Sequence, residues 1–193
     1  MKKKYKNFKI LKEFTVDVEQ LKKDFEKVAT ILKNNQDTDV YSHGFVSINK
    51  VPGEDRPLYK ADTRAAHWIP SENGEEKYRD GLELKYENNY SEFYTEFKNT
   101  YTEEVCTLLS KKFKLGRIRY SIRSPRSCLS WHRDIAKRIH IPITTNPGCQ
   151  FVIEDEVYHM PANGNVYLAN TLNYHNFFNG GETNRIHFIA VVL

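Results

Sequence analysis

The sequence predicts a mostly β domain, an antiparallel sandwich or barrel of jelly-roll type with helices packed on one of its sheets. Two observations support this fold class. From Gly116 onward, short segments rich in β-branched and aromatic residues alternate with turn signals, such as those at 146–148 and 179–181. Closely spaced short strands of this kind are typical of antiparallel sandwiches and barrels. Before Gly116, two stretches have the apolar spacing of amphipathic helices.

The first predicted helix runs from Asp17, which can cap it, to about Asn34. An aspartate at this position can accept hydrogen bonds from the free backbone N–H groups of the first turn. A strand at 5–14 is expected to precede this helix. The apolar side of the helix, at spacings of four, three and four residues, consists of Leu21, Phe25, Val28 and Leu32.

The rest of the amino-terminal half is predicted to be mixed. A short apolar strand is expected at 44–48 and a second helix within about 91–113. The intervening residues 50–88 are rich in charge, Gly, Pro and Asn, and we interpret them as a long loop region. A loop of this length in a compact domain is often functional.

The second half is predicted to consist of short strands. The length of 193 residues fits one domain with a substantial core. We therefore expect 1–193 to be a single domain, in which the amino-terminal elements of 1–114 pack on a β-core at 115–193. The strands of this core are expected at 116–123, 138–143, 149–153, 156–160, 165–169 and 185–192.

The composition, with 39% apolar and 28% charged residues, is that of a globular protein and excludes a disordered or fibrous chain. No run approaches the roughly 18 apolar residues that indicate a membrane span, and the basic start lacks the apolar stretch of a secretory signal. Cys106, Cys128 and Cys149 form no Cys-x-x-Cys pair, so neither a disulfide framework nor a zinc–thiolate site is expected. We expect a cytoplasmic protein that binds no membrane.

The net charge of +4 is unevenly distributed along the chain. Residues 1–14 contain six lysines and one glutamate, and residues 111–140 contain ten lysines and arginines against the single acid Asp134. One interpretation is a solvated basic face that touches nucleic acid. The other is a pocket for anionic ligands, which the strand pattern favours.

Three features of the second half point together to a metal site. His132 and Asp134 are two residues apart, so in an extended segment their side chains point to the same face. His175 follows 41 residues after Asp134, and Arg185 begins the last predicted strand. Two histidines and one carboxylate form the facial triad of non-haem Fe(II) enzymes. Each feature is weak alone, but their order in a strand-rich half is far more specific.

Strand parity indicates that cationic groups line the interior of the barrel. In the strand at 138–143, Arg138 and His140 share a face opposite three isoleucines. In the last strand, Arg185 and His187 share a face opposite Ile186 and Phe188. The third strand, at 116–123, places on one face Arg117, Arg119, Ser121 and Arg123. Polar faces exposed to solvent would explain one such strand, whereas a barrel that is lined with cations and covered by helices explains all three.

Residues 115–193 closely resemble the aspartyl/asparaginyl β-hydroxylase-like family of Fe(II)/2-oxoglutarate-dependent oxygenases. The resemblance is carried by residues 129–134, 138–143, 163–171, His175 with Asn179, and 184–188. The amino-terminal half is matched only in general layout. The resemblance implies a double-stranded β-helix fold and a hydroxylase that uses Fe(II), 2-oxoglutarate and O2.

The same resemblance implies roles for individual residues. His132, Asp134 and His175 would ligate the iron, and Arg185 would bind the distal carboxylate of 2-oxoglutarate. Three more residues would help to bind the cosubstrate. Arg138 and His140 would lie near its proximal carboxylate, and Ser121 would contribute a hydroxyl from the strand that precedes the His-x-Asp motif. The arginines that share the inward face of Ser121 could hold a second anion, such as the α-carboxylate of an amino acid, although a surface salt bridge is the alternative for each. They are Arg119, which we prefer, Arg117 and Arg123.

Asp134 separates this chain from the animal peptide-hydroxylating branch, which lacks the carboxylate ligand. The shorter gap between His132 and the Arg-x-His motif points the same way. Both features favour the small bacterial members, some of which hydroxylate free amino acids such as proline. We therefore expect hydroxylation of an aliphatic C–H of a free amino acid, proline-like or other, with release of succinate and CO2.

Three alternatives stay open at this point. The first keeps the iron but acts on an Asp, Asn or Pro side chain of a peptide or protein. The second is a non-enzymatic basic β-barrel that binds nucleic acid or another polyanion with strong salt dependence. The placement of the charge makes it the weaker choice. The third is a cupin-like barrel with another divalent metal and no 2-oxoglutarate, which leaves Arg185 without a purpose.

Overall fold

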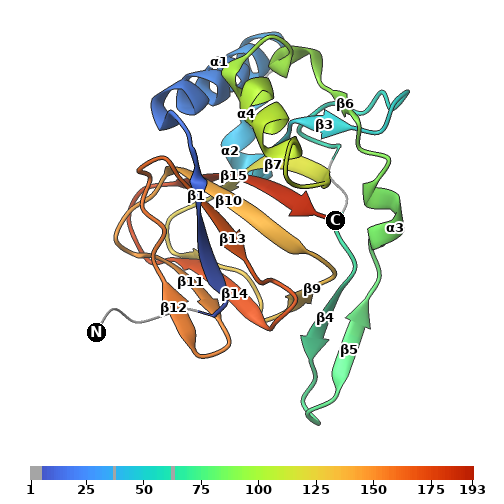
Figure 1. The fold of residues 1–193 in the computed structure, drawn as a ribbon, viewed down its shortest axis with the longest axis vertical. Helices are drawn as coiled ribbons and strands as arrows, with labels where there is room; N and C mark the ends of the chain where they lie inside the picture. The colour runs from blue at the N-terminus through green and yellow to red at the C-terminus, as the bar shows by residue number, and fades with distance from the viewer. Residues whose placement is uncertain (1–5, 37, 62–63) are drawn as a thin grey trace.

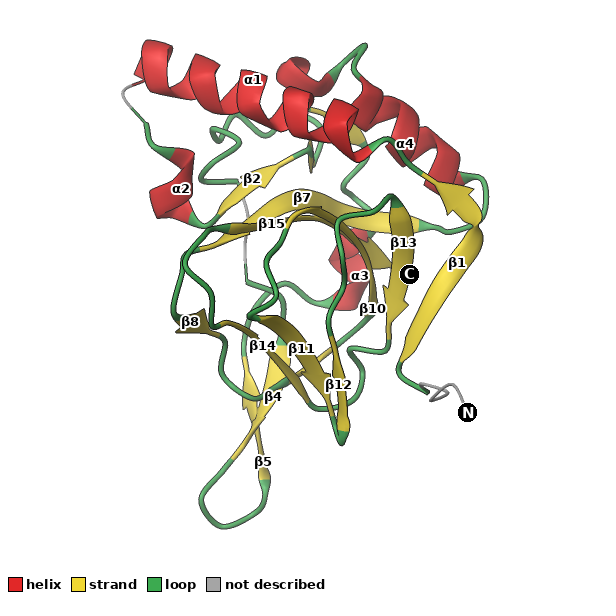
Figure 2. Cartoon of the chain, turned by 90° about the vertical axis from the view of Figure 1, so that its left-hand side faces the viewer, coloured by secondary structure: helices red, strands yellow, loops and turns green. Residues whose placement is uncertain are grey.

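The computed structural model describes residues 6–36, 38–61 and 64–193 (Figure 1). Two antiparallel β-sheets form the body of the molecule, and helices cover the outer face of the larger sheet (Figure 2). This is the mostly β architecture with flanking helices that the sequence predicts. Among the described residues, no helix is both long and apolar enough to cross a membrane.

The two sheets are built mainly from the second half of the chain. The larger sheet has the order β1-β13-β10-β15-β7-β2, and the smaller has the order β12-β11-β14-β8. From β7 onward the chain passes repeatedly between the sheets and every pairing is antiparallel, which is the winding of a jelly roll. The larger sheet consists of β1 (Phe8–Thr15), β2 (Phe45–Ser47), β7 (Leu115–Arg123), β10 (Lys137–Thr144), β13 (Asn165–Ala169) and β15 (Arg185–Val192). The smaller sheet consists of β8 (Ser127–Cys128), β11 (Cys149–Ile153), β12 (Glu156–Tyr158) and β14 (His175–Asn179).

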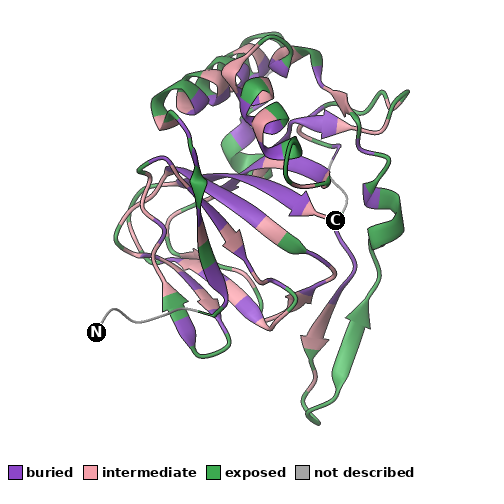
Figure 3. Cartoon of the chain, in the orientation of Figure 1, coloured by how far each residue is buried: buried purple, intermediate pink, exposed green. Residues whose placement is uncertain are grey.

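The main hydrophobic core lies between the larger sheet and the helices α1 (Val18–Gln36) and α4 (Tyr101–Ser110) (Figures 2 and 3). All four apolar residues predicted for the first helix are buried in it, together with Ile139, Ile141 and Phe188. The apolar faces of β10 and β15 therefore point to the helices. Their polar faces point into the space between the two sheets, as the strand parity predicts.

The first helix starts where its cap is predicted. Asp17 Oδ1 accepts hydrogen bonds from the backbone N–H groups of Glu19 and Gln20, at 3.0 and 3.1 Å. The preceding strand is β1; Tyr5, at the start of the predicted strand, lies outside the described residues. The strand predicted at 156–160 is shorter and ends at Tyr158.

The second helix lies within the predicted range of about 91–113, but it is shorter than this range and begins ten residues after its start. Residues 92–97 form the short strand β6 (Glu92–Phe93) and the 3-10 turn η1 (Thr95–Phe97), and α4 begins only at Tyr101. Asn99 has a positive φ of 57°, and Thr100 is extended. This backbone cannot continue a helix, so the apolar residues before it belong to other elements.

The region predicted as a long loop, 50–88, contains regular structure. A hairpin of β4 (His67–Pro70) and β5 (Glu76–Arg79) projects beside the barrel and is followed by α3 (Leu84–Glu87) (Figure 1). Strand β4 also pairs with β9 (Arg133–Asp134), which brings the hairpin to the segment that carries the His-x-Asp motif. Two further short elements are β3 (Asn49–Lys50), which pairs with β6, and α2 (Val40–His43).

Candidate metal centre

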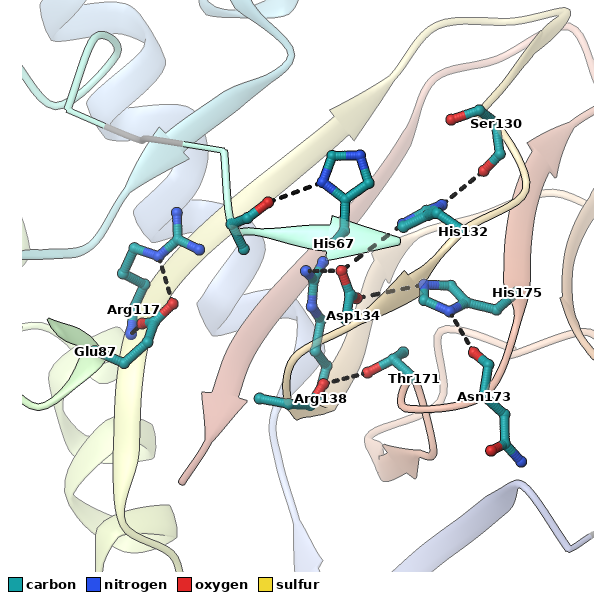
Figure 4. Close-up of polar contacts among 12 residues, drawn as sticks. His67, Glu87, Arg117, Ser130, His132, Asp134, Arg138, Thr171, Asn173 and His175 are labelled. Atoms are coloured by element: carbon teal, nitrogen blue, oxygen red, sulfur yellow. Dashed lines mark hydrogen bonds and ion pairs between the residues drawn. The ribbon is translucent and has the colours of Figure 1, made fainter. Parts of the chain in front are cut away.

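His132, Asp134 and His175 meet at one end of the space between the sheets (Figure 4). The backbones of His132 and His175 exchange two hydrogen bonds, of 3.0 and 2.7 Å, which places the two imidazoles side by side. Asp134 reaches both rings: its Oδ1 lies 3.8 Å from His132 Nε2, and its Oδ2 lies 3.4 Å from His175 Nε2. The three side chains offer ligand atoms that all lie within 4.8 Å of one another.

The outer ring nitrogens of both histidines are held by backbone carbonyls. His132 Nδ1 donates to Ser130 O at 2.6 Å, and His175 Nδ1 donates to Asn173 O at 3.0 Å, because a carbonyl can only accept. Burial, together with the neighbouring His175, lowers the pKa of His132 to about 4, so this ring is neutral near pH 7. The Nε2 atoms of both rings are left facing the Asp134 carboxylate. This arrangement of outer partners is the one that orients histidines as metal ligands.

Asp134 is buried in surroundings that favour a bound cation. Its Oδ2 is buried and has no hydrogen-bond donor among the described residues, while Oδ1 pairs with Arg138 at 2.7 Å. Burial alone would raise the pKa of Asp134, but Arg138 and His175 outweigh this effect and hold the pKa well below its ordinary value. A buried carboxylate that faces the Nε2 atoms of two imidazoles fits a divalent metal ion, because the ion would satisfy all three groups.

Arg185, at the start of β15, is a buried cation without an acidic partner among the described residues. It is 3% exposed. One of its Nη atoms donates to His187 Nδ1 at 2.9 Å, and its guanidinium carbon lies 3.8 Å from the ring centre of Phe177. Burial lowers the pKa of Arg185 to about 9. A buried guanidinium with no carboxylate beside it is costly, so this position favours an anionic ligand.

A single cavity of about 330 Å³ connects the triad to Arg185. Most of the residues that the sequence singles out line it. Asp134 is the one acidic side chain among the described residues of its wall, against five arginines, which are Arg64, Arg119, Arg123, Arg138 and Arg185. The other predicted residues that line it are His132, His175, His140 and Ser121.

Arg117 does not reach this cavity. It is buried at the other end of β7, where its Nε lies 2.9 Å from Glu87 Oε1 and its backbone N–H donates to Glu87 Oε2 (Figure 4). Glu87, at the end of α3, is fully buried. The charge of Arg117 is therefore neutralised within the protein, and we do not propose a substrate-binding role for it.

His140 lies deeper in the cavity, where it is buried against Phe151. Neither of its ring nitrogens has a hydrogen-bond partner among the described residues. Burial and the charges of Arg185 and Arg138 lower the pKa of His140 well below its ordinary value, so the ring is neutral. A neutral imidazole offers one donor and one acceptor to a ligand in the cavity.

His67 is a residue of this site that sequence reasoning missed. It lies on β4 directly opposite Asp134, is buried, and its ring centre lies 5.7 Å from that of His132. Its Nδ1 donates to Ala65 O at 3.0 Å. No pattern in the sequence marks this histidine, because its strand falls in the region that we interpret as a loop.

Comparisons with known proteins identify the family. Residues 65–193, more than half of the chain, match the family described as aspartyl/asparaginyl beta-hydroxylase. The match begins at the β4–β5 hairpin and therefore covers both the hairpin and the metal-site candidates. No curated protein matches the chain.

Several solved structures are similar to the chain at low sequence identity. AviO1 from Streptomyces viridochromogenes Tue57 is 12% identical, with a TM-score of 0.49 over 96% of this chain and 89% of that one. A 2OG-Fe(II) oxygenase family oxidoreductase from Burkholderia pseudomallei is 13% identical, with a TM-score of 0.41 over 67% and 66%. A prolyl hydroxylase from Trichoplax adhaerens, in complex with a hypoxia inducible factor peptide fragment, is 12% identical, with a TM-score of 0.38 over 93% and 94%. It is the family match, together with the jelly-roll core, that assigns the chain: the protein is a hydroxylase of the aspartyl/asparaginyl beta-hydroxylase family.

Proposed function

We propose that the protein is an Fe(II)- and 2-oxoglutarate-dependent dioxygenase that hydroxylates an aliphatic C–H of a free amino acid. The observation that carries this proposal is the pairing of two features in one cavity: a two-histidine, one-carboxylate cluster and a buried arginine that has no acidic partner within the described part of the chain. The first suits Fe(II), and the second suits the far end of a dicarboxylate. When bound, iron and 2-oxoglutarate would supply the activation of O2, with succinate and CO2 as by-products.

His132, Asp134 and His175 are the residues that would hold the metal. Two imidazoles and one carboxylate are a ligand set that suits Fe(II) and would leave coordination positions on the metal for a chelating cosubstrate and O2. The backbone carbonyls on both Nδ1 atoms fix the rings, so little reorganisation is needed on binding. Arg138, which pairs with Asp134, would be freed to interact with a ligand when the carboxylate turns to a metal.

The remaining wall residues would orient 2-oxoglutarate and exclude water. Arg185 would take the distal carboxylate, since a guanidinium can donate two parallel hydrogen bonds to a carboxylate. Arg138 and His140 would lie toward the proximal carboxylate, and Ser121, on β7 opposite β15, would assist from the side. The orphaned ring nitrogens of His140 give this role a physical basis, because a ligand oxygen would satisfy the donor.

The charge of the wall supports a substrate that carries a carboxylate. Once 2-oxoglutarate engages Arg185 and the metal, Arg119 and Arg123 of β7 still border the cavity. Burial and the charges of Arg138 and Arg123 lower the pKa of Arg119 to about 9, which reflects the crowding of cations here. An amino acid would place its α-carboxylate among them. The cavity is at the small end of the range for ligand sites, which favours a free amino acid over a longer substrate.

The test of this function is anaerobic binding of Fe(II) and 2-oxoglutarate, followed by succinate release in O2. The wild type should bind both, and His132→Ala should lose the iron. His43→Ala is the matched control, since His43 is exposed and lies outside the cavity. Equal iron and 2-oxoglutarate binding by wild type and His132→Ala, or no binding by either, would overturn the proposal.

The substrate class is tested with a panel of free amino acids and short peptides, with succinate and hydroxylated product as readouts. Turnover with a free amino acid is expected, whereas turnover confined to peptides would contradict that part of the proposal and favour a peptide side chain. Arg119→Gln and Arg123→Gln should raise the KM of the substrate much more than that of 2-oxoglutarate. Equal effects on both KM values would remove the substrate role of these arginines.

A further inference from the structure

His187 is a buried histidine to which the proposed reaction gives no role. It follows Arg185 by two residues on the same face of β15, lies opposite Ser121 of β7, and is 1% exposed. It does not border the large cavity. It borders a separate void of about 10 Å³ that Arg185 also reaches. A ligand in the large cavity therefore meets Arg185 and not His187, so any influence of His187 on the ligand passes through Arg185.

The contact between the two side chains fixes the protonation of the imidazole. A guanidinium can only donate, so His187 Nδ1, 2.9 Å from an Nη of Arg185, must accept and must carry no proton. Burial and the adjacent Arg185 lower the pKa of His187 well below its ordinary value, which keeps the ring neutral. His187 is thus a permanent acceptor that carries no charge.

Arg185 is held on two sides. The ring of Phe177, from the smaller sheet, lies 3.8 Å from the guanidinium carbon and fixes the plane of the group. His187 engages one Nη atom and fixes the rotation of the group within that plane. The guanidinium has five N–H donors, and neither contact neutralises its charge, so an orientated cation faces the cavity.

We infer that His187 is a positioning residue that holds Arg185 in the orientation that receives the distal carboxylate of 2-oxoglutarate. This inference rests on the proposed function. An acidic residue in the place of His187 would orient Arg185 equally well but would also pair with it, and 2-oxoglutarate would then have to compete. A neutral acceptor orients the arginine and leaves its charge for the cosubstrate.

Two substitutions separate orientation from packing. In His187→Asn, the amide oxygen can occupy the place of Nδ1, since both atoms are two bonds from Cβ, and can accept from Arg185. In His187→Leu, a methyl group occupies that place and cannot accept. If His187→Leu does not fold, His187→Ala replaces it as the variant without an acceptor, and near-ultraviolet circular dichroism establishes folding for each protein.

The measurement is anaerobic calorimetric titration of the Fe(II)-loaded proteins with two ligands. 2-Oxoglutarate and 2-oxovalerate share the metal-chelating end and the chain length, but only the first has a distal carboxylate. His187→Leu should raise the Kd of 2-oxoglutarate roughly 10- to 100-fold, as expected when a hydrogen bond to a charged group is lost. The Kd of 2-oxovalerate should stay within about twofold of the wild type, and His187→Asn should recover most of the affinity for 2-oxoglutarate.

Equal weakening of both ligands by His187→Leu would show a general structural role and overturn the inference. Unchanged affinity for 2-oxoglutarate, or equal weakening by His187→Asn and His187→Leu, would overturn it as well. Failure of the proposed function is distinguishable, because it appears in the wild type: a wild-type protein that binds neither ligand, or binds both equally, refutes the role of Arg185 before any variant is measured.

Discussion

Replacing Arg185 by methionine should have two opposite effects: it should weaken 2-oxoglutarate binding and stabilise the ligand-free protein. Arg185 is 3% exposed, has no acidic partner among the described residues, and contacts a neutral imidazole and the face of Phe177. The folded protein therefore bears the cost of a buried charge that only an anionic ligand offsets. A methionine of similar length removes that cost but also removes the partner of the ligand.

The magnitude follows from the pKa of Arg185. Its fall from 12.5 to about 9 on burial corresponds to roughly 5 kcal/mol. At pH 7 the group is charged in both the folded and the unfolded protein, so the whole cost applies there. The lost hydrogen bond to His187 and the lost contact with Phe177 return about 2 to 4 kcal/mol. We expect a net stabilisation of about 1 to 3 kcal/mol, which raises the Tm by roughly 2 to 12 °C for a chain of this size.

The binding effect is expected to be larger. Truncating one partner of a buried charged pair costs about 2 to 5 kcal/mol, which is roughly a 30- to 4,000-fold increase in the Kd of 2-oxoglutarate. Urea unfolding followed by circular dichroism gives the first quantity, and anaerobic calorimetry gives the second. Arg185→Met that is less stable than wild type, or that binds 2-oxoglutarate with unchanged Kd, would refute the reasoning.

Arg117→Met is the matched control, because it removes a second buried arginine that does have an acidic partner. The side chains of Arg117 and Glu87 are 5% and 0% exposed, and the ion pair is 2.9 Å long. Breaking it leaves the Glu87 carboxylate buried without its cation, although the backbone N–H of residue 117 still donates to it. The loss should destabilise the protein by about 3 to 5 kcal/mol. The Kd of 2-oxoglutarate should not change in the folded variant. The two substitutions are therefore expected to change stability in opposite directions.

Three further predictions concern the metal, a cap and the thiols. Mn(II) at a hundredfold its Kd should raise the free energy of unfolding of the wild type by about 2.7 kcal/mol, and Asp134→Asn should abolish this gain; an equal gain in both proteins would contradict the ligand assignment. Asp17→Ala should lower the free energy of unfolding by about 1 kcal/mol through loss of the cap and leave ligand affinity unchanged. Iodoacetamide should modify Cys128, which is exposed, before Cys106 and Cys149, which are buried; burial raises the pKa of Cys106 well above its ordinary value, and mass spectrometry of the peptides checks the order.

The fold class could be predicted because turn signals in the sequence mark the ends of most strands in the second half. The bounds of β11, β13 and β15 are close to those predicted, since each is a run of β-branched or aromatic residues between turn signals. The period of two in β10 and β15 also identified which face is apolar. That face is covered by α1 and α4, as the apolar spacing of the helices requires.

Elements whose register depends on a partner strand could not be predicted. Strand β14, which begins at His175, reads as His-Asn-Phe-Phe-Asn and has no clear alternation, so only its pairing with β11 makes it a strand. Strand β9 has two residues and exists through its pairing with β4. The same holds for His67, whose place beside the candidate metal ligands depends on that pairing and on nothing within its own segment.

Strand parity predicted which residues share one face of β7, but not which of them border the cavity. Arg117, Arg119 and Arg123 share one face of β7, yet Arg119 and Arg123 border the cavity while Arg117 meets Glu87. The difference is made by α3, an element from the region that we interpret as a loop. A pattern with a period of two cannot indicate which other segment covers each end of the strand.

The contrast between Arg117 and Arg185 shows how the protein assigns roles to chemically identical groups. Both are buried, and the chemistry of the partner decides the outcome. Glu87 neutralises Arg117 and makes it part of the scaffold. His187 accepts one hydrogen bond from Arg185 but contributes no negative charge, so the cation stays available. The ligand-free fold bears the cost of this unpaired charge, and the proposed binding of a dicarboxylate would offset it. The stability that the ligand-free protein lacks would then add to its affinity for 2-oxoglutarate. For this reason we expect Arg185→Met to lose affinity for 2-oxoglutarate and to gain stability.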